Sequence, residues 1–169
     1  MDVEAAIRAR RTHKQFGGEA VAEAVVRELV DLARLAPNHK LTNPWRFRLL
    51  GPKTRARIDE LVSEAEGIKL RRAPTLLLVT AARSDDPVLA EEDVLATAAA
   101  TYALLLAATG RGLASYWRTP SCFREQAVRD LLGLDANEVL VALVHLGGPV
   151  TDPPGKERAP VEDVFSVQP

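Results

Sequence analysis

The chain has 169 residues, 47% of them hydrophobic and 27% charged, and its formal net charge at pH 7 is −1. A nearly neutral chain lacks the positive field that draws basic domains to nucleic acid, so we expect no nucleic-acid partner. With one cysteine it cannot form an intrachain disulfide, and its first residues lack the long apolar stretch of a signal peptide. These features favour a reducing, cytoplasmic setting.

The length suits one domain with one core, and no linker-like segment divides it, so we expect a single domain over residues 1–169. The longest apolar stretch, residues 96–108, is too short and too rich in alanine for a membrane span. No membrane association is therefore expected.

The N-terminal segment predicts a helix from Asp2, on which Val3, Ala6, Ile7 and Arg10 share one face. Arg10 then falls where the next core residue would lie. A guanidinium in that position needs an anion, and the planar geometry of arginine suits a phosphate. The alternative is that Arg10 reaches water from the helix end.

The rest of the chain predicts a mixture of helices and strands. In chain order we expect a helix over 20–36, a strand over 46–50, a helix over 54–65, a strand over 75–80, a helix over 91–110, a strand over 113–117, a helix over 124–132 and a strand over 138–146. The continuous apolar run 75–80 predicts a strand buried on both faces near the sheet centre. The helix 91–110, opened by three acidic residues, is apolar nearly all round, so we expect the sheet and a second subunit to cover it.

The tail, residues 147–169, contains five prolines and cannot be an ordinary packed element. It still carries Val161, Val164, Phe165 and Val167. Disordered tails are usually poorer in large apolar residues, so an extended arm that embraces another protomer is favoured over disorder.

Several kinds of site lack a signature. There is no glycine-rich phosphate loop after a strand, and the three histidines lie far apart without cysteine or carboxylate at ligand spacing, so no metal is expected. Cys122 has no neighbouring base, and no serine lies in a Gly-x-Ser-x-Gly turn. The sequence therefore predicts no nucleophilic side chain.

Two loops remain as candidate binding segments. Residues 36–47 place amides, an imidazole and an ammonium between a helix end and a strand, and residues 117–119 end a strand with an indole, a guanidinium and a hydroxyl. Taken alone, each is better explained as an ordinary connection whose polar side chains satisfy their own turns.

Together these segments resemble the nitroreductase family, and within it the compact branch of single-domain NAD(P)H nitroreductases. The resemblance rests on Arg10-Arg11-Thr12-x-Lys14-x-Phe16, on Ala36-Pro37-Asn38-His39 through Asn43-Pro44-Trp45-Arg46-Phe47, on Gly112 to Trp117-Arg118-Thr119, and on Leu146-Gly147-Gly148-Pro149. It implies an α+β fold with a mainly antiparallel sheet flanked by helices. It also implies an intertwined homodimer that exchanges C-terminal arms, with two FMN molecules at the interface.

The resemblance assigns roles around the cofactor. Arg10 would pair with the FMN phosphate, Arg11 and Thr12 would hold phosphate or ribityl oxygens, and Lys14 would approach the pyrimidine edge of the flavin. The remaining contacts implied are Asn38 and His39 from the partner subunit, Trp117, Arg118 and Thr119 along the ring and phosphate side, and the basic pair Lys156 and Arg158 near the phosphate. Compact members carry an arginine directly before the Ala-Pro loop, where this chain has Leu35, with Arg34 one residue earlier. Because helical direction turns by about 100° per residue, that contact is not carried over.

The activity implied is that of an FMN-dependent NAD(P)H oxidoreductase. NADH or NADPH would deliver hydride to flavin N5, and an electron-poor acceptor, a nitroaromatic or a quinone, would then replace it in a ping-pong cycle. The alternatives are a flavin-binding storage or sensing protein without turnover, and an anion-binding module built on the basic N-terminal segment.

Overall fold

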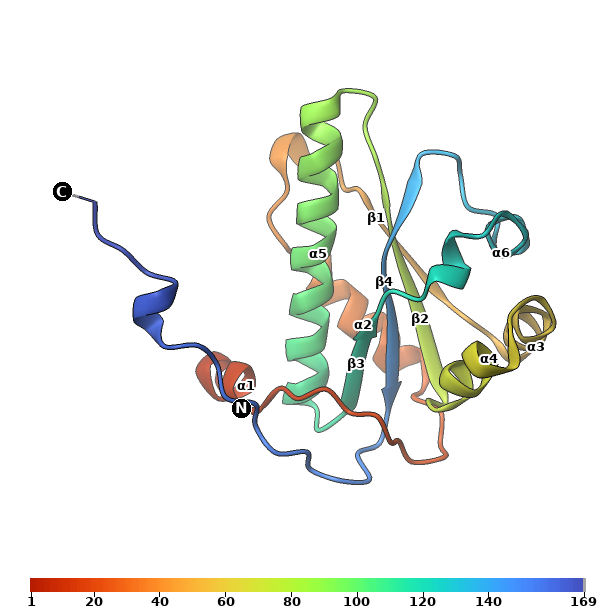
Figure 1. The fold of residues 1–169 in the computed structure, drawn as a ribbon, viewed down its shortest axis with the longest axis horizontal. Coiled ribbons are helices and arrows are strands. Elements are labelled where there is room, and N and C mark those ends of the chain that lie inside the picture. The colour runs from red at the N-terminus through yellow and green to blue at the C-terminus, as the bar shows by residue number, and fades with distance from the viewer. Residues whose placement is uncertain (169) are drawn as a thin grey trace.

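A four-stranded antiparallel sheet lies at the centre of the computed structural model, which describes residues 1–168 (Figure 1). Its strands are β1 (Trp45–Leu49), β2 (Thr75–Ala82), β3 (Ala114–Arg118) and β4 (Glu138–Gly147), in the order β1-β2-β4-β3. All three pairings are antiparallel. The fold is therefore α+β, as expected from the sequence.

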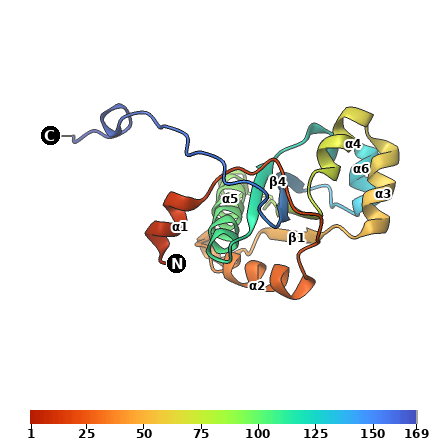
Figure 2. The same ribbon diagram turned by 90° about the horizontal axis from the view of Figure 1, so that it is seen from below.

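Helices cover both faces of this sheet, as Figures 1 and 2 show. The helices are α1 (Val3–Ala9), α2 (Glu23–Ala33), α3 (Pro52–Leu61), α4 (Glu64–Arg71), α5 (Pro87–Gly110) and α6 (Gln126–Leu132), with short 3-10 turns at His39–Leu41, Ser121–Arg124 and Val161–Asp163. One core joins α2 and α5 to the sheet, and the other joins α3, α4 and α6 to the opposite face.

Strand β2 is buried on both faces, which confirms the prediction from its apolar run. Leu77 and Val79 belong to the core under α2 and α5, whereas Leu76 and Leu78 belong to the core under α3, α4 and α6. Alternation along a strand sends neighbouring side chains to opposite faces, so one short apolar segment serves both cores.

Helix α5 begins one turn earlier than the acidic residues 91–93 predict. Asp86 is its N-cap, accepting hydrogen bonds from the backbone N–H groups of Val88 and Leu89, and Pro87 occupies the first turn. By length and composition α5 could cross a membrane, but it lies against the sheet and α2. Leu95 and Tyr102 stay exposed on its other side. The sheet thus supplies the expected cover on one side only.

Helix α1 differs from expectation. Asp2 caps it as expected, accepting a hydrogen bond from the N–H of Ala5, but Ala6 is its one buried residue, and Ile7 is 48% exposed. Arg10 is the C-cap and lies outside the helix. The prediction of a core-facing stripe that ends in Arg10 is wrong, because α1 packs on α5 at the periphery instead of on the sheet.

The expected helix over 54–65 is two helices. The chain leaves helical geometry at Val62, and Ser63 caps α4 by accepting a hydrogen bond from the N–H of Glu66. The sequence did not predict α4 as a separate helix, because its weak pattern of apolar residues looked like a continuation of the helix before it.

The C-terminal arm leaves the body after β4 and passes the N-terminal segment. Phe16 forms a β-bridge with Pro149, and a Cβ on Gly147 would lie 3.1 Å from Phe16 and Pro74, so glycine permits this close approach. Farther on, the arm extends away from the body (Figure 1), with Phe165 66% exposed.

A buried ion pair ties three strands together. The carboxylate of Glu138 accepts two hydrogen bonds of 2.7 Å from Arg48 and another from the hydroxyl of Thr80. Burial tends to raise the pKa of Glu138, but these bonds, with the backbone N–H of Asp135, outweigh it and lower the pKa from 4.5 to about 2. The pair therefore stabilises the folded state while Glu138 is ionised.

Replacing Glu138 with Gln should lower the free energy of unfolding by about 3 kcal/mol at pH 7, because it breaks a buried pair. Since the folded-state pKa lies below the ordinary value, the wild-type advantage is complete above about pH 4.5 and disappears as the pH falls toward 2. Urea denaturation at several pH values measures this, with the exposed Glu91→Gln as control. A Glu138→Gln penalty that does not shrink in acid would contradict the assignment.

Candidate functional site

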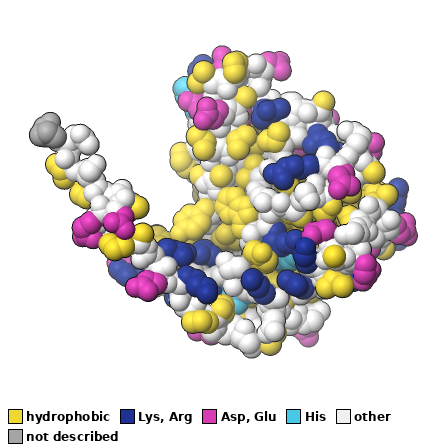
Figure 3. Space-filling view, in the orientation of Figure 1, with side chains coloured by type: hydrophobic (Ala, Val, Ile, Leu, Met, Phe, Trp, Pro, Cys, Tyr) yellow, Lys and Arg dark blue, Asp and Glu magenta, His cyan; other side chains and the backbone are white. Residues whose placement is uncertain are grey.

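A cavity of about 1250 Å³ opens where the N-terminal segment meets the first part of the C-terminal arm. It lies between the end of α1, residues 10–15, Tyr102 of α5 and arm residues 151–158. Its cationic lining residues are Arg8, Arg10, Arg11, Lys14, Lys156 and Arg158, and no aspartate or glutamate is among its lining residues. Figure 3 shows Lys and Arg side chains gathered where the arm joins the body.

Most of this charge is not neutralised by the chain itself. Within residues 1–168, no carboxylate lies within ion-pair distance of Arg10, Lys14, Lys156 or Arg158, whereas Arg8 pairs with Glu4 on the exposed side of α1 at 2.7 Å. Phosphate oxygens suit such a set of guanidinium and ammonium donors. The cavity is therefore chemically suited to an anionic ligand.

Arg11 gives the N-terminal segment its shape. Its Nη1 donates hydrogen bonds to the backbone carbonyls of Arg8 and Arg10, where the last carbonyls of α1 lack helical partners. The arm crosses directly over this guanidinium at Gly155, where a Cβ would lie 3.1 Å from Nη2 of Arg11. Gly155 therefore lies beside the end of the Arg11 side chain, next to Lys156, which also lines the cavity.

The residues predicted on β3 do not line this cavity. Trp117 is half-buried against the α2–α5 core and donates from Nε1 to the carbonyl of Val141 at 3.0 Å. Arg118 points to the other face of the sheet, where it donates to Glu66 of α4 at 3.2 Å, and Thr119 is exposed. The structure thus brings together Arg10, Arg11, Thr12, Lys14, Lys156 and Arg158, and leaves Trp117, Arg118 and Thr119 outside the lining.

Asn38 and His39 lie elsewhere on the chain. The loop that carries them contacts Glu92 and Asp93 of α5, whereas the cavity reaches α5 at Tyr102. At 1.5 Å per residue these places are about 15 Å apart along the helix. In a single copy, Asn38 and His39 do not share the cavity with Arg10.

A second polar cluster lies on the α4 face of the sheet. His145 of β4 is buried, and burial, followed by the charges of Arg118, Arg55 and Arg72, lowers its pKa to about 3. Neither of its ring nitrogens has a hydrogen-bond partner in the part of the chain that the structure describes. The imidazole is therefore neutral and contributes no charge to an anion site.

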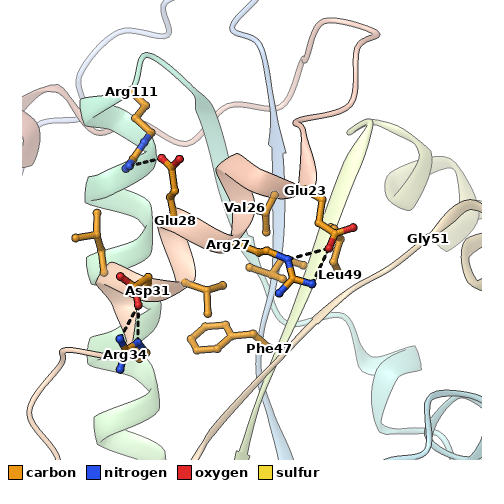
Figure 4. A pocket seen from close by; sticks show the side chains of 13 residues that line it. Glu23, Val26, Arg27, Glu28, Asp31, Arg34, Phe47, Leu49, Gly51 and Arg111 are labelled. Atoms are coloured by element: carbon orange, nitrogen blue, oxygen red, sulfur yellow. Dashed lines mark hydrogen bonds and ion pairs between the residues drawn. The ribbon is translucent and has the colours of Figure 1, made fainter.

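A different groove, of about 1010 Å³, lies between α2 and β1 (Figure 4). Its lining includes the apolar side chains of Val26, Phe47 and Leu49. The charged residues around it pair with one another: Arg27 with Glu23, Arg34 with Asp31 and Arg111 with Glu28, at 2.6 to 2.9 Å. With its charge neutralised, this groove suits an apolar segment and not an anion.

Tyr102 and Gly155 are among the contributors to the cavity that the sequence alone did not indicate. Tyr102 is the one aromatic residue in an otherwise aliphatic helix and is half exposed, a signal that could have marked it. The role of Gly155 depends on a crossing between distant segments and had no local signal. Among the residues described, no group of three or more His, Cys, Asp or Glu side chains could hold a metal ion.

Comparison with known proteins identifies relatives of the whole chain. The sequence model of the nitroreductase family matches residues 7–66 and 63–148. A Bacillus subtilis protein named "Putative NAD(P)H nitroreductase YfhC" is 28% identical, over 95% of this chain and 91% of its own length.

Solved structures agree in fold. A nitroreductase-like family protein from Bacillus cereus superposes with a TM-score of 0.89 at 26% identity, covering 99% of this chain and 96% of the other. A Desulfovibrio desulfuricans protein, described as "a putative nitroreductase in complex with fmn", superposes with a TM-score of 0.82 at 25% identity, covering 99% and 96%.

Proposed function

The chain belongs to the nitroreductase family, and from that premise we propose that it is an FMN-dependent oxidoreductase. It takes hydride from NADH or NADPH and passes it to an electron-poor small molecule such as a nitroaromatic or a quinone. The observation that carries the proposal is the cavity between the N-terminal segment and the C-terminal arm, with six cationic residues and no carboxylate in its lining. Two further observations support the proposal: the Bacillus subtilis relative is named as an NAD(P)H nitroreductase, and the Desulfovibrio desulfuricans relative is described in complex with FMN.

The donor set fits FMN. Arg10, with no carboxylate partner in the described chain, holds the phosphate, and Lys156 and Arg158 approach it from the arm. Thr12 offers a hydroxyl to phosphate or ribityl oxygens. Nη1 of Arg11 donates hydrogen bonds to the carbonyls of Arg8 and Arg10 at the end of α1. Arg11 therefore both holds the N-terminal segment in shape and lines the cavity that receives the ligand.

The residues of β3 take a more restricted role than their motif suggests. Thr119, exposed at the end of the strand, is free to contact the cofactor when the site is completed. The indole of Trp117 donates to the carbonyl of Val141 and Nη2 of Arg118 donates to Glu66, whereas Nη1 of Arg118 is buried without a hydrogen-bond partner among the described residues. We propose that they fix the strand end, so that its backbone faces the flavin.

When bound, FMN supplies the hydride chemistry, so the chain needs no nucleophile of its own. Lys14 lines the same cavity, is exposed and has no ion-pair partner within residues 1–168. An ammonium beside the N1–C2=O edge of the ring favours the form with more negative charge there. Lys14 therefore tunes the potential, and Arg10 retains the cofactor.

The proposed working unit is a homodimer with exchanged arms. Val164, Phe165 and Val167 of the arm are exposed, and so are Val3 and Ile7 of α1. The charge-neutralised apolar groove in Figure 4 is the depression we propose for the arm of the second copy. In such a dimer Asn38 and His39 are available to the partner's flavin. A reducing, cytoplasmic location is proposed too, because the one cysteine is buried and free.

Anaerobic titration tests the function. Purified protein should bind FMN, and its yellow colour should bleach with NADH or NADPH and return when a quinone or nitroaromatic is added. Arg10→Ala should weaken FMN binding by about tenfold or more, because a charge-assisted phosphate contact is lost. Arg57→Ala on α3 is the matched control. Failure to bind FMN would refute the proposal, and bound flavin that no nicotinamide reduces would indicate a flavin carrier.

Replacing Lys14 with Ala should lower the two-electron midpoint potential of bound FMN by about 30 to 60 mV, because a hydrogen bond to a charged group contributes about 1.5 to 3 kcal/mol. The potential is measured by dye equilibration, with Lys53→Ala, an exposed lysine on α3, as control. Equal potentials in wild type and Lys14→Ala would remove Lys14 from this role.

Ending the chain after Pro160 should convert the dimer to monomers, since it removes the apolar end of the arm. Light scattering after gel filtration measures the mass at micromolar concentration. A Val164→Ser, Phe165→Ser variant keeps the length and should weaken the dimer in the same way. A monomeric wild type, or a dimer unaffected by both changes, would contradict arm exchange.

A further inference from the structure

In the loop between α2 and β1, residues 36–44, three residues adopt a backbone conformation that residues with a side chain disfavour. Lys40, Leu41 and Asn43 have φ of 53°, 51° and 48°, in the left-handed region that favours glycine, and none of them is glycine. Such residues keep this conformation only when the surroundings impose it, and they concentrate where a loop must hold one shape for function. The contacts that impose the shape are therefore informative.

The main external contact comes from Asp93 of α5, which is 3% exposed. Its Oδ1 accepts a hydrogen bond of 2.6 Å from the hydroxyl of Thr42 in the loop, and its Oδ2 accepts one of 2.8 Å from the backbone N–H of Ser84. The Ser84 bond anchors the carboxylate to the body independently of the loop. Asp93 thus presents a fixed, buried acceptor to Thr42.

Within the loop, the Thr42 hydroxyl also lies 3.5 Å from Oδ1 of Asn38, one of the residues that the proposed dimer places at the partner's flavin. Oδ1 of Asn38 accepts from the N–H of Asn43 at 3.0 Å, and Nδ2 of Asn43 donates to the carbonyl of Leu41 at 2.8 Å. The carbonyl side of Asn38 is therefore used to close the loop, which leaves its amide N–H groups for a ligand.

The neighbouring residue of α5 orients the imidazole. Nδ1 of His39 lies 2.6 Å from Oε2 of Glu92. With Nδ1 engaged, the Nε2 edge is the one left for a ligand. Two consecutive acidic residues of α5 therefore contact this loop, Glu92 at His39 and Asp93 at Thr42.

We infer that Asp93 is a positioning residue of the proposed flavin site: through Thr42 it holds residues 38–43 in the shape that presents Asn38 and His39 to the partner's flavin, and Glu92 orients His39. This inference rests on the proposed function. It gives a specific task to acidic residues that the sequence placed at the helix start, since α5 begins at Pro87 and Asp93 lies inside it.

The test compares Thr42→Val with Thr42→Ser. Val has nearly the shape of Thr but lacks the hydroxyl, and Ser restores it. Two quantities are measured: the FMN dissociation constant, by fluorescence quenching, and the rate of tryptic cleavage after the exposed Lys40 in protein without FMN, mapped by mass spectrometry. Thr42→Val should raise both by about tenfold, and Thr42→Ser should stay close to wild type.

Thr97→Val is the matched control. The buried hydroxyl of Thr97 donates to the backbone carbonyl of Asp93 at 2.8 Å and does not touch the loop. This variant should lower thermal stability and leave FMN affinity and cleavage after Lys40 unchanged. A general loss of stability is thereby separated from a loss of loop shape.

The outcomes distinguish this inference from the proposed function. If wild type binds FMN and Thr42→Val matches it in both quantities within twofold, Asp93 does not position the loop, while the proposed function stands. If wild type does not bind FMN, the proposed function fails and the inference fails with it, even where cleavage after Lys40 responds to Thr42→Val.

Discussion

Positive charges gathered in one cavity repel one another, and this molecule concentrates them between its N-terminal segment and its C-terminal arm. Two unit charges 8 Å apart in water repel by roughly 0.5 kcal/mol, and more where protein excludes water. Arg10, Lys14, Lys156 and Arg158 have no carboxylate partner within the described residues to offset this cost, although the chain as a whole is nearly neutral. A bound dianion relieves it. The site is thus arranged for a ligand that the chain does not itself supply.

The sheet brings the N-terminal segment and the C-terminal arm together. Strand β4 runs through the centre of the molecule, paired on both sides and buried along most of its length, and it delivers the arm beside the N-terminal segment at the Phe16–Pro149 bridge. The Glu138–Arg48 pair fixes the registry of the strands at the far end. The sheet therefore sets the position of the two segments that line the cavity.

Helix α5 links the cavity to the strained loop and also separates them. It contributes Tyr102 to the cavity and, about 15 Å away along the helix, Asp93 and Glu92 to the loop. In the proposed dimer, the loop of one copy would reach the cavity of the other. The exposed apolar residues of α1 and the arm, and the side of α5 that the sheet does not cover, are consistent with that arrangement.

Local patterns predicted much of the fold and drew attention to several residues that line the cavity. The apolar run of β2 is encoded in neighbouring residues, and its interpretation agrees with the structure. The basic N-terminal motif is local too, but Arg10 lies at the C-cap of α1 and not on a core-facing stripe of that helix. Arg118 could have been placed on the face opposite Trp117 by strand alternation, but its partner Glu66 lies on a helix that the sequence did not reveal. The task proposed for Asp93 and the crossing at Gly155 come from contacts between distant segments, which no local pattern contains.

The central claim is that the cationic cavity holds the phosphate of a flavin. The most direct test compares the binding of FMN and riboflavin to the wild-type protein by isothermal titration at two salt concentrations, because the two ligands differ only in the phosphate. The account predicts that FMN binds at least tenfold more tightly, and that this advantage falls as salt rises. Equal affinity for the two ligands at the lower salt concentration would contradict it.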